Sequence, residues 1–362
     1  MNRLSRTLVI AEAGVNHNGS LQRALELVDA AAAAGADIVK FQTFRAGRLA
    51  SRSAPKADYQ KRETGTTESQ LDMLRALELD EAAHRTLINR CAEKGIEFLS
   101  TPFDHESLQL LVRTFDLPRL KLGSGDLTNA PLLLAIARSA KPLILSTGMA
   151  TLSEVEEALG VLAFGYASLP DAAPSIAAFR SAYESDVGQQ ALQKKVALMH
   201  CTTEYPTPAG DVNLRAMDTL RLAFGLEVGY SDHTQGSAIS LAAVARGATI
   251  VEKHFTLDRN LPGPDHKSSL EPEELADMVN DIRRVEAALG NGIKRSAQSE
   301  RPNRIVARKS LVAARPIQAG EGFSAENLDI KRPGGGIAPV LYWEFLGRQS
   351  PRPYAADEVI EP

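Results

Sequence analysis

Two histidines stand at matching places in the sequence, because each one ends an apolar, β-branched run. His233 ends "VGYSDH" and His254 ends "TIVEKH". Neutral imidazole binds Mn, Fe, Co, Ni and Zn ions, and two such ligands leave coordination positions open for substrate and water. A single histidine at the end of a strand is more often a hydrogen-bonded cap. The matched pair instead predicts one shared metal ion.

Two lysines lie inside otherwise apolar runs, Lys40 in "VKFQTF" and Lys121 in "LKLGSGD". A buried ammonium group without a partner is costly, so an anionic ligand or a carboxylate must lie nearby. An internal ion pair, with Glu12 or Glu252, is the alternative, but two interior cations fit a phosphate better. Hydroxyl groups that can donate to phosphate oxygens end three further runs, at Thr101, Ser124 and Ser231.

Other polar residues at the ends of runs suit a proton transfer or a sugar. Glu12 ends "IAEAG", where a general base or a partner of a metal-bound water would stand, and it can equally pair with Lys40. The segment "CTTEYPTP" offers Thr203 and Tyr205, although Tyr-Pro pairs are common in plain turns. Asp265 lies on a loop with two prolines, a stiff mount for a carboxylate that binds sugar hydroxyls.

The elements that must position these residues are short apolar runs that alternate with segments of helical spacing. This alternation predicts an α/β fold with a parallel sheet. Eight βα units predict a closed (β/α)8 TIM barrel, in which polar residues at the carboxyl ends of the strands converge on one face. The eight predicted strands are residues 7–14, 37–44, 96–103, 119–125, 141–148, 195–202, 226–233 and 248–255.

The order of the chain predicts two domains. Residues 1–290 form the barrel, 291–304 are a basic and polar linker, and 305–362 form a small, turn-rich β domain. Residues 164–190 are rich in Ala, Ser and Pro and too long for an ordinary helix-to-strand connection, so we interpret them as a surface insertion.

The composition favours a small-molecule partner in the cytoplasm. The 362 residues carry a formal charge of −4, which gives no general attraction to nucleic acid or to an anionic membrane. Cys91 and Cys201 stand far apart within apolar runs, as expected for free thiols in a reducing compartment. The apolar run at the N-terminus is short and meets Glu12, so we expect neither a signal peptide nor a membrane span.

Nine blocks together carry a resemblance over nearly the whole chain. They are "IAEAGVNHNGS", "VKFQTF", "FLSTPFD", "KLGSGD", "LSTGMATL", "CTTEYPTP", "GYSDHT", "EKHFT" and "PGPD". In this order they resemble the bacterial sialic acid synthase family, and "RKSLVAARPIQAGEGFSAENLDIKRPGGGI" resembles its C-terminal antifreeze-like (SAF) domain. The resemblance implies a barrel fused to that domain, in a domain-swapped homodimer. It also implies an N-acetylneuraminate synthase, which condenses phosphoenolpyruvate, N-acetylmannosamine and water into a nine-carbon 2-keto sugar acid and phosphate.

The resemblance also implies a role for each candidate residue. His233 and His254 would hold a divalent ion, usually manganese, with magnesium or cobalt as alternatives, and Glu12 would handle the attacking water. The implied phosphoenolpyruvate contacts are Lys40, Thr101, Lys121, Ser124, Thr203 and Ser231. The implied sugar contacts are Gln42, Asp126, Tyr205, Asp265 and, extended from the antifreeze-like domain of the other subunit, Arg332.

Some positions depart from the best-known N-acetylneuraminate synthases. Asp126 stands where those enzymes have Glu, Thr203 stands where they have Asn, and the 164–190 insertion is absent from typical members. "CTTEYP" and "PGPDHKSS" are also similar to members that make legionaminic acid from 2,4-diacetamido-2,4,6-trideoxymannose. Two further alternatives are the phosphoenolpyruvate condensation that opens aromatic biosynthesis and a non-catalytic carbohydrate- or ice-binding protein. We expect the insertion to lie on the non-catalytic face, with little effect on the chemistry.

Overall fold

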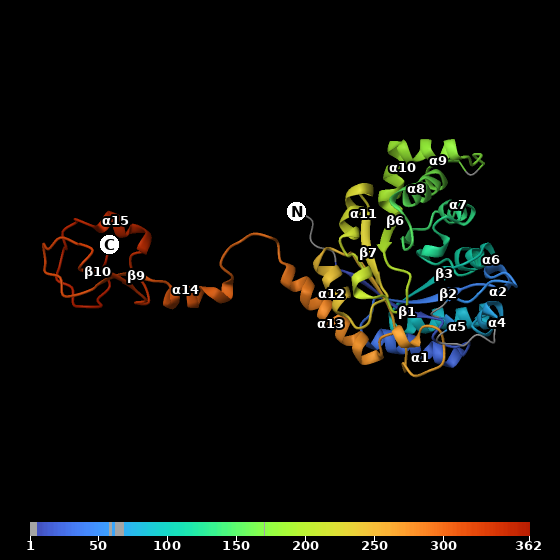
Figure 1. Ribbon diagram of the computed structural model, residues 1–362, viewed down its shortest axis with the longest axis horizontal. Helices are drawn as coiled ribbons and strands as arrows, with labels where there is room; N and C mark the ends of the chain where they lie inside the picture. Colours follow the sequence, from blue (N-terminus) through green and yellow to red (C-terminus); the bar gives the residue numbers. More distant parts are fainter. Residues whose placement is uncertain (1–5, 58–59, 62–68, 170) are drawn as a thin grey trace. The chain divides into compact units, whose positions relative to one another are not determined.

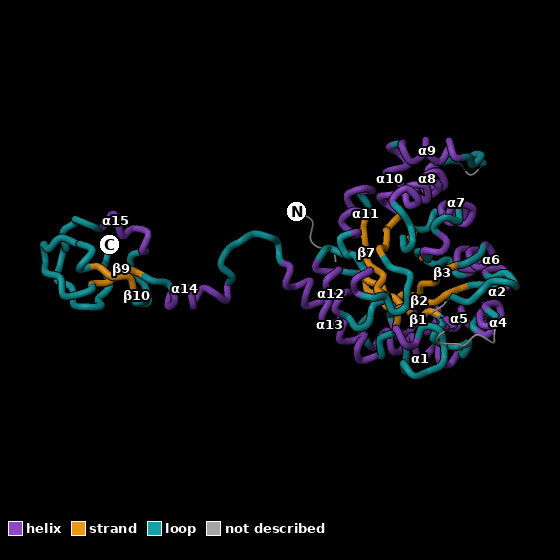
Figure 2. The backbone as a smooth tube through the Cα atoms, viewed as in Figure 1, coloured by secondary structure: helices purple, strands orange, loops and turns teal. Residues whose placement is uncertain are grey.

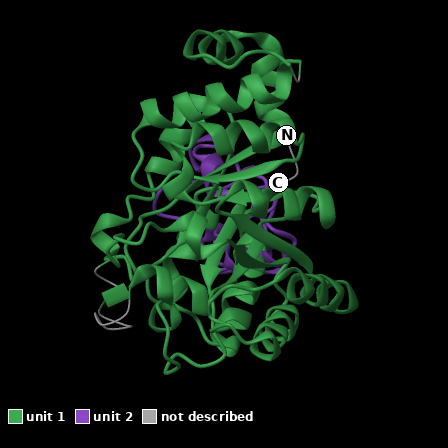
Figure 3. Cartoon of the chain, turned by 90° about the vertical axis from the view of Figure 1, so that its right-hand side faces the viewer, with its two compact units in different colours: residues 1–290 green, residues 291–362 purple. Residues whose placement is uncertain are grey.

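The computed structural model describes residues 6–57, 60–61, 69–169 and 171–362. It divides into two compact units, residues 1–290 and residues 291–362, which are coloured separately in Figure 3. Each unit has its own hydrophobic core and is described by itself. Among the described residues, no helix has the length and apolar character that a membrane crossing requires.

Unit 1 is a nearly closed barrel of eight parallel strands surrounded by helices (Figures 1 and 2). The strands pair in the order β3-β2-β1-β8-β7-β6-β5-β4, and the outer two, β3 and β4, contact one another. All eight lie within the predicted runs, so the barrel prediction is confirmed. Their bounds are Leu8–Gly14 (β1), Ile38–Thr43 (β2), Glu97–Pro102 (β3), Leu120–Leu122 (β4), Leu143–Ser146 (β5), Val196–His200 (β6), Glu227–Asp232 (β7) and Ile250–His254 (β8).

Several helices of unit 1, including α1 and α8, bury an apolar face and begin at a polar cap. The Ser20 hydroxyl accepts a hydrogen bond from the Arg23 amide at the start of α1, and Thr151 and Glu154 form the capping box that opens α8. Among its described residues, the α-helices of unit 1 are Leu21–Ala33 (α1), Ala46–Leu49 (α2), Gln70–Ala76 (α4), Glu81–Lys94 (α5), His105–Gln109 (α6), Ala130–Arg138 (α7), Leu152–Ala167 (α8), Ile176–Glu184 (α9), Asp186–Lys195 (α10), Ala216–Phe224 (α11), Ala238–Ala245 (α12) and Pro272–Leu289 (α13).

The barrel interior has an apolar floor. Side chains alternate along a strand, so one residue in two points inward. The inward residues nearer the amino ends of the strands form a buried cluster of their own: Ile10, Ile38, Leu99, Ile144, Met199 and Ile250. Gly229 belongs to the same level, and a β-carbon there would lie 2.5 Å from Met199 Sδ and from the Ile250 carbonyl oxygen. The floor is therefore too tightly packed to admit a side chain at this position.

The 164–190 insertion is largely helical. α8 continues to Ala167, and α9 and α10 then pack beside it before the chain enters β6. The Phe179 ring meets the Phe164 ring edge-on, with centroids 5.3 Å apart. Gly160 on α8 lets the backbone of Phe179 approach, since a β-carbon at Gly160 would lie 3.2 Å from the Phe179 carbonyl oxygen.

Unit 2 is small and rich in turns. Strands β9 (Ser310–Ala313) and β10 (Leu328–Lys331) pair antiparallel, and a short helix, α15 (Tyr342–Phe345), packs with them around a core that includes Phe323 and Tyr354. The stretch 291–304, predicted to be a linker without regular structure, contains a 3-10 turn and the first residues of helix α14 (Arg301–Ala307). The basic and polar sequence of this stretch has no clear period that would predict the helix, whose side chains are exposed.

Candidate active site

A layer of buried charged groups lies directly above the apolar floor. Glu12 on β1 and Lys40 on β2 form an ion pair with 2.8 Å between Oε2 and Nζ. Glu252 on β8 lies between the two lysines, with its Oε2 3.7 Å from Lys40 Nζ and its Oε1 3.3 Å from Lys121 Nζ. The internal ion pairs considered as an alternative from the sequence are therefore formed, with both glutamates.

Hydroxyl groups complete this layer. Lys40 Nζ donates to Thr101 Oγ1 at 3.3 Å, and Ser231 Oγ donates to Glu252 Oε1 at 2.9 Å. Lys121 Nζ also donates to Ser146 Oγ at 2.8 Å. The site thus gathers two cations, two carboxylates and three hydroxyls from strands far apart in the sequence, and all of them are buried.

The two carboxylates of this layer differ in their proton affinity. Burial raises the pKa of Glu12 to about 7, although Lys40 opposes the shift. Burial alone would also raise the pKa of Glu252, but Lys121 and Lys40 outweigh it and lower that pKa to about 2. Glu12 is therefore able to exchange a proton near neutral pH, whereas Glu252 stays ionised as the counter-charge of the lysines.

The two histidines lie together at the rim of this layer. Their ring centroids are 5.9 Å apart, and the Tyr205 ring lies 4.2 Å from that of His233 and 5.8 Å from that of His254. His233 Nδ1 donates to the Thr202 carbonyl oxygen at 2.6 Å, since a carbonyl can only accept. The lone pair of His233 therefore lies on Nε2, which is 3.3 Å from Ser231 Oγ.

The histidine pair fits a divalent ion. Burial lowers the pKa of His233 to about 4 and that of His254 well below its ordinary value, so both rings are neutral, as a metal ligand must be. His254 Nδ1 is buried without a hydrogen-bond partner. Within the described part of the chain, no group of three or more His, Cys, Asp or Glu is arranged to hold a metal, so the protein would supply two imidazoles and leave the other positions to water and substrate.

A second polar group surrounds Gly148, just after β5. Ser124 Oγ accepts a hydrogen bond from the Gly148 amide at 2.9 Å and lies 3.2 Å from Cys201 Sγ. A β-carbon at Gly148 would lie 2.6 Å from Thr203 Oγ1 and 2.8 Å from Ser124 Oγ. The backbone thus approaches both predicted phosphoenolpyruvate contacts closely, as only glycine permits.

Three of the predicted sugar contacts lie around the histidines and the charged layer. Gln42 Nε2 donates to Glu12 Oε1 at 3.4 Å, and Tyr205 packs on His233. Asp265 is buried, which raises its pKa to about 6 against the effect of Lys40. These three residues therefore share one rim of the barrel.

Of the remaining two predicted sugar contacts, Asp126 lies after β4 in the same turn as Ser124, and Arg332 lies in unit 2. Asp126 ends the 3-10 turn Ser124–Asp126 and accepts a hydrogen bond from Asn129 Nδ2 at 2.9 Å, and burial raises its pKa. Arg332 follows β10 in unit 2 and is exposed there, so its role at the sugar stays a prediction.

Sequence reasoning missed the central position of Glu252 and the part of Ser146. Glu252 was considered only as a possible ion-pair partner. The alternation of a strand would have identified Glu252 as a residue of the site, because alternate residues share a face and Glu252 precedes His254 by two positions. The same spacing relates Ser231 to His233 and Lys40 to Gln42, which all point inward.

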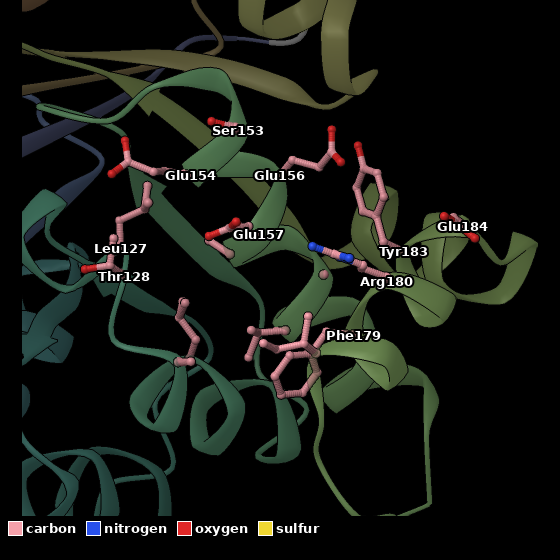
Figure 4. A pocket seen from close by; sticks show the side chains of 16 residues that line it. Leu127, Thr128, Ser153, Glu154, Glu156, Glu157, Phe179, Arg180, Tyr183 and Glu184 are labelled. Atoms are coloured by element: carbon pink, nitrogen blue, oxygen red, sulfur yellow. The ribbon is translucent and has the colours of Figure 1, made fainter.

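A cavity of about 590 Å³ lies apart from these residues, among α7, α8 and α9. Figure 4 shows Arg180 and Tyr183 of α9 facing Glu156 and Glu157 of α8. The cavity is also lined by Leu127 and Thr128, which directly follow Asp126. We expect the insertion on the non-catalytic face from the sequence. In the structure it also reaches the residues that follow Asp126, because α9 folds back along α8.

The comparisons with known proteins place this barrel and its buried charged layer in the nonulosonic acid synthase class of enzymes, which are phosphoenolpyruvate-dependent transferases that form a C–C bond. The chain belongs to the NeuB family, which matches residues 27–294, and a SAF domain matches residues 308–362. The recognised family and its two-part architecture are thereby confirmed, and the non-catalytic alternative is set aside.

The similar proteins span almost the whole chain. It is 49% identical to N,N'-diacetyllegionaminic acid synthase of Campylobacter jejuni, over 99% of each chain. It is 44% identical to the enzyme of the same name from Legionella pneumophila, over 94% of this chain and 89% of that one. A crystal structure of the N-acetylneuraminic acid synthetase of Leptospira borgpetersenii, in complex with citrate, matches with a TM-score of 0.66 and 33% identity, over 83% of this chain and 90% of that chain.

Proposed function

We propose that this protein condenses phosphoenolpyruvate with 2,4-diacetamido-2,4,6-trideoxymannose and water, giving N,N'-diacetyllegionaminic acid and phosphate. The support for this acceptor is the identity of 49% and 44% to two N,N'-diacetyllegionaminic acid synthases. It agrees with Asp126 and Thr203, which depart from the N-acetylneuraminate synthase pattern. The two identities favour the diacetamido sugar over N-acetylmannosamine, the acceptor that the sequence first suggested.

The observation that carries the reaction type is the buried layer of Lys40, Lys121, Glu12 and Glu252. Two ammonium groups held by carboxylates in a dry site can exchange those partners for the phosphate and carboxylate of phosphoenolpyruvate. In our proposal the ligand is held by the two lysines and by the hydroxyls of Thr101, Ser124, Thr203 and Ser231.

The reaction forms one C–C bond and replaces the C2–O bond to phosphate with a C2–O bond to the water oxygen. C3 of phosphoenolpyruvate bonds to the aldehyde carbon of the sugar, whose oxygen takes up a proton. Water adds to C2 and loses one proton. The C2–OH then gives its remaining proton to the departing phosphate as the C2–O bond to phosphate breaks, which leaves the 2-keto group. Glu12 takes the proton of that water, a role that its pKa of about 7 suits.

The histidine pair has a separate task in this proposal. His233 and His254 would hold a divalent ion, manganese in the first place and magnesium or cobalt as alternatives. When bound, the ion supplies Lewis-acid polarisation of the sugar carbonyl. The Thr202 carbonyl fixes the tautomer of His233 that presents Nε2 to such an ion.

The sugar would be held by Gln42, Asp126, Tyr205 and Asp265, and by Arg332 from the second subunit of a domain-swapped homodimer. Asp265 is buried, and its carboxylate would accept hydrogen bonds from the hydroxyl groups of the neutral sugar. We further propose a cytoplasmic location, since the two cysteines of the chain are buried free thiols, which suit a reducing compartment.

The test is phosphate release from phosphoenolpyruvate with Mn²⁺ present, in three parallel arms: the diacetamido sugar, N-acetylmannosamine and no acceptor. We expect release in the first arm to exceed both others. Faster release with N-acetylmannosamine would assign the protein to N-acetylneuraminate synthesis. Release in neither sugar arm would contradict the proposed reaction. Glu12→Gln is the matched inactive control, since it keeps the shape of the side chain and removes its charge.

A further inference from the structure

A second buried ion pair lies on the outer side of the same two strand ends. Asp232 stands between Ser231 and His233, and Lys253 stands in the corresponding place before His254. Because side chains alternate, these two point away from the barrel interior while their neighbours point into it. Lys253 Nζ lies 3.3 Å from Asp232 Oδ2, and both side chains are 0% exposed.

A hydrogen-bond network ties this pair to both sides of His233. Asp232 Oδ1 accepts from the Thr234 amide at 2.9 Å and from Thr234 Oγ1 at 2.7 Å, and its Oδ2 accepts from Ser240 Oγ of α12 at 2.6 Å. Lys253 Nζ donates to the Thr234 carbonyl oxygen. The residues before and after His233 are thus both held by side chains that reach across from β8 and α12.

The pair also stands where the strand pairing stops. The β7–β8 register runs through Ser231 and Glu252 and ends at Asp232 opposite Lys253. His233 follows the last paired residue of β7, so its backbone has no further ladder partner on β8. The ion pair is therefore the last link that fixes the spacing of the two strands before the histidines.

We propose that Asp232 and Lys253 are positioning residues, which set the mutual orientation of the His233 and His254 imidazoles for a shared cation. The inference rests on the proposed function, in which these imidazoles hold the metal. A buried ion pair often adds little stability compared with an apolar pair of similar size, so its place in the fold suggests a role in geometry. Partners that orient metal ligands from behind typically change metal affinity when they are replaced.

The experiment compares Lys253→Met and Asp232→Asn with the wild-type chain. Mn²⁺ affinity is measured by the loss of the free-ion signal in electron paramagnetic resonance, and the imidazole resonances are recorded by NMR without metal. We expect Mn²⁺ to bind about 10- to 100-fold more weakly in both variants. The His233 resonances should shift without metal, because the Thr202 hydrogen bond loses its geometry.

Asp37→Asn is the matched control. Asp37 accepts from the Val9 amide and from Arg283, each at 2.8 Å, so it also joins a strand to a helix through an ion pair, but near the amino ends of the strands. We expect this variant to lose stability while its Mn²⁺ affinity and its His233 resonances stay as in the wild-type chain.

The double variant Asp232→Leu with Lys253→Met separates geometry from stability, because it leaves no unpaired buried charge. We expect its unfolding temperature to recover while Mn²⁺ binding stays weak. Recovery of both would overturn the inference and show a merely structural pair, as would unchanged His233 resonances in either single variant. Absence of Mn²⁺ binding by the wild-type chain would instead refute the metal role of the proposed function, and the metal-free resonances would still decide the inference.

Discussion

At the scale of single residues, the site depends on one carboxylate that exchanges protons and one that does not. Glu12 and Glu252 are both buried and both lie beside Lys40, yet their pKa values move in opposite directions. The difference arises because Glu252 lies between two lysines, whereas the charge of Glu12 is offset mainly by one. The number of lysines beside each carboxylate thus decides whether it can act as a base or stays ionised as a counter-charge.

The pKa of Glu12 predicts the pH dependence of the reaction. Its basic form increases as pH rises through about 7, so kcat/KM should rise with pH and level off above that value. In Glu12→Gln we expect a rate at least about 100-fold lower, with this inflection lost. Steady-state rates across the pH range would check it. An inflection that persists in the variant would assign the titration to another group.

Replacing Glu252 should leave the buried Lys121 ammonium group without a carboxylate and Lys40 with Glu12 alone. We expect Glu252→Gln to lower the free energy of unfolding by about 3–5 kcal/mol at neutral pH, and added phosphate to restore part of it. The wild-type contribution is present above the ordinary pKa of 4.5 and is lost as pH falls toward about 2. Urea unfolding with and without phosphate measures both effects.

Glu106→Gln is the control for this prediction. Its ion pair with Arg48, at 2.8 Å, is exposed on the surface, so the loss should be at most about 1 kcal/mol and independent of phosphate. Equal losses in the two variants would contradict the view that burial makes Glu252 special.

Which residues gather at the site could largely be predicted, but how they pair could not. Lys40 and Lys121 were recognisable because a charge inside an apolar run needs a partner. Strand alternation and spacing of two would also have exposed Glu252. The distances that give Glu252 both lysines depend on the stagger of β2, β4 and β8 in the barrel, which no local pattern encodes.

At the scale of elements, the alternating runs predicted every strand of the barrel, because parallel strands buried on both sides are continuously apolar. The helices of the insertion were not predicted. Ala and Ser are frequent in 164–190, and the apolar contacts of this segment, such as the half-buried Phe179 on Phe164, join residues far apart in the sequence. α14 was missed for a related reason, since its side chains are exposed and show no apolar face.

The close approach at Gly148 gives a prediction about the turn after β5. In Gly148→Ala the new methyl group would displace Ser124 and Thr203, so KM for phosphoenolpyruvate should rise, at a stability cost of about 1–3 kcal/mol. Gly125→Ala is the matched control in the neighbouring turn, where a β-carbon meets nothing within 4 Å. Kinetics of both variants would check it. A similar KM in the two would show that the Gly148 contacts do not hold the ligand.

At the scale of the whole molecule, the chain consists of two units with separate cores. The resemblance of the second unit to the antifreeze-like domain predicted its compact, turn-rich fold. The assembly of two chains is a matter of surfaces that a single sequence does not reveal, so the homodimer and the role of Arg332 remain proposals.

Arg332→Ala tests that role. We expect KM for the acceptor sugar to rise while KM for phosphoenolpyruvate stays unchanged, because the guanidinium group would contact the acyl group of the sugar alone. Lys331→Ala is the neighbouring control, since Lys331 is engaged with Asp329 and Asp357 within its own unit. Equal changes in both KM values for Arg332→Ala would argue against a contact with the sugar.

The burial of both cysteines has a practical consequence. Cys91 and Cys201 are the two thiols of the sequence, and both are shielded from solvent, so one added surface cysteine would take up a thiol-reactive dye selectively. Ile176 is 69% exposed and lines the cavity that also borders Thr128. A polarity-sensitive fluorophore attached at Ile176→Cys would therefore report optically on the turn that carries Asp126, without touching a residue of the site.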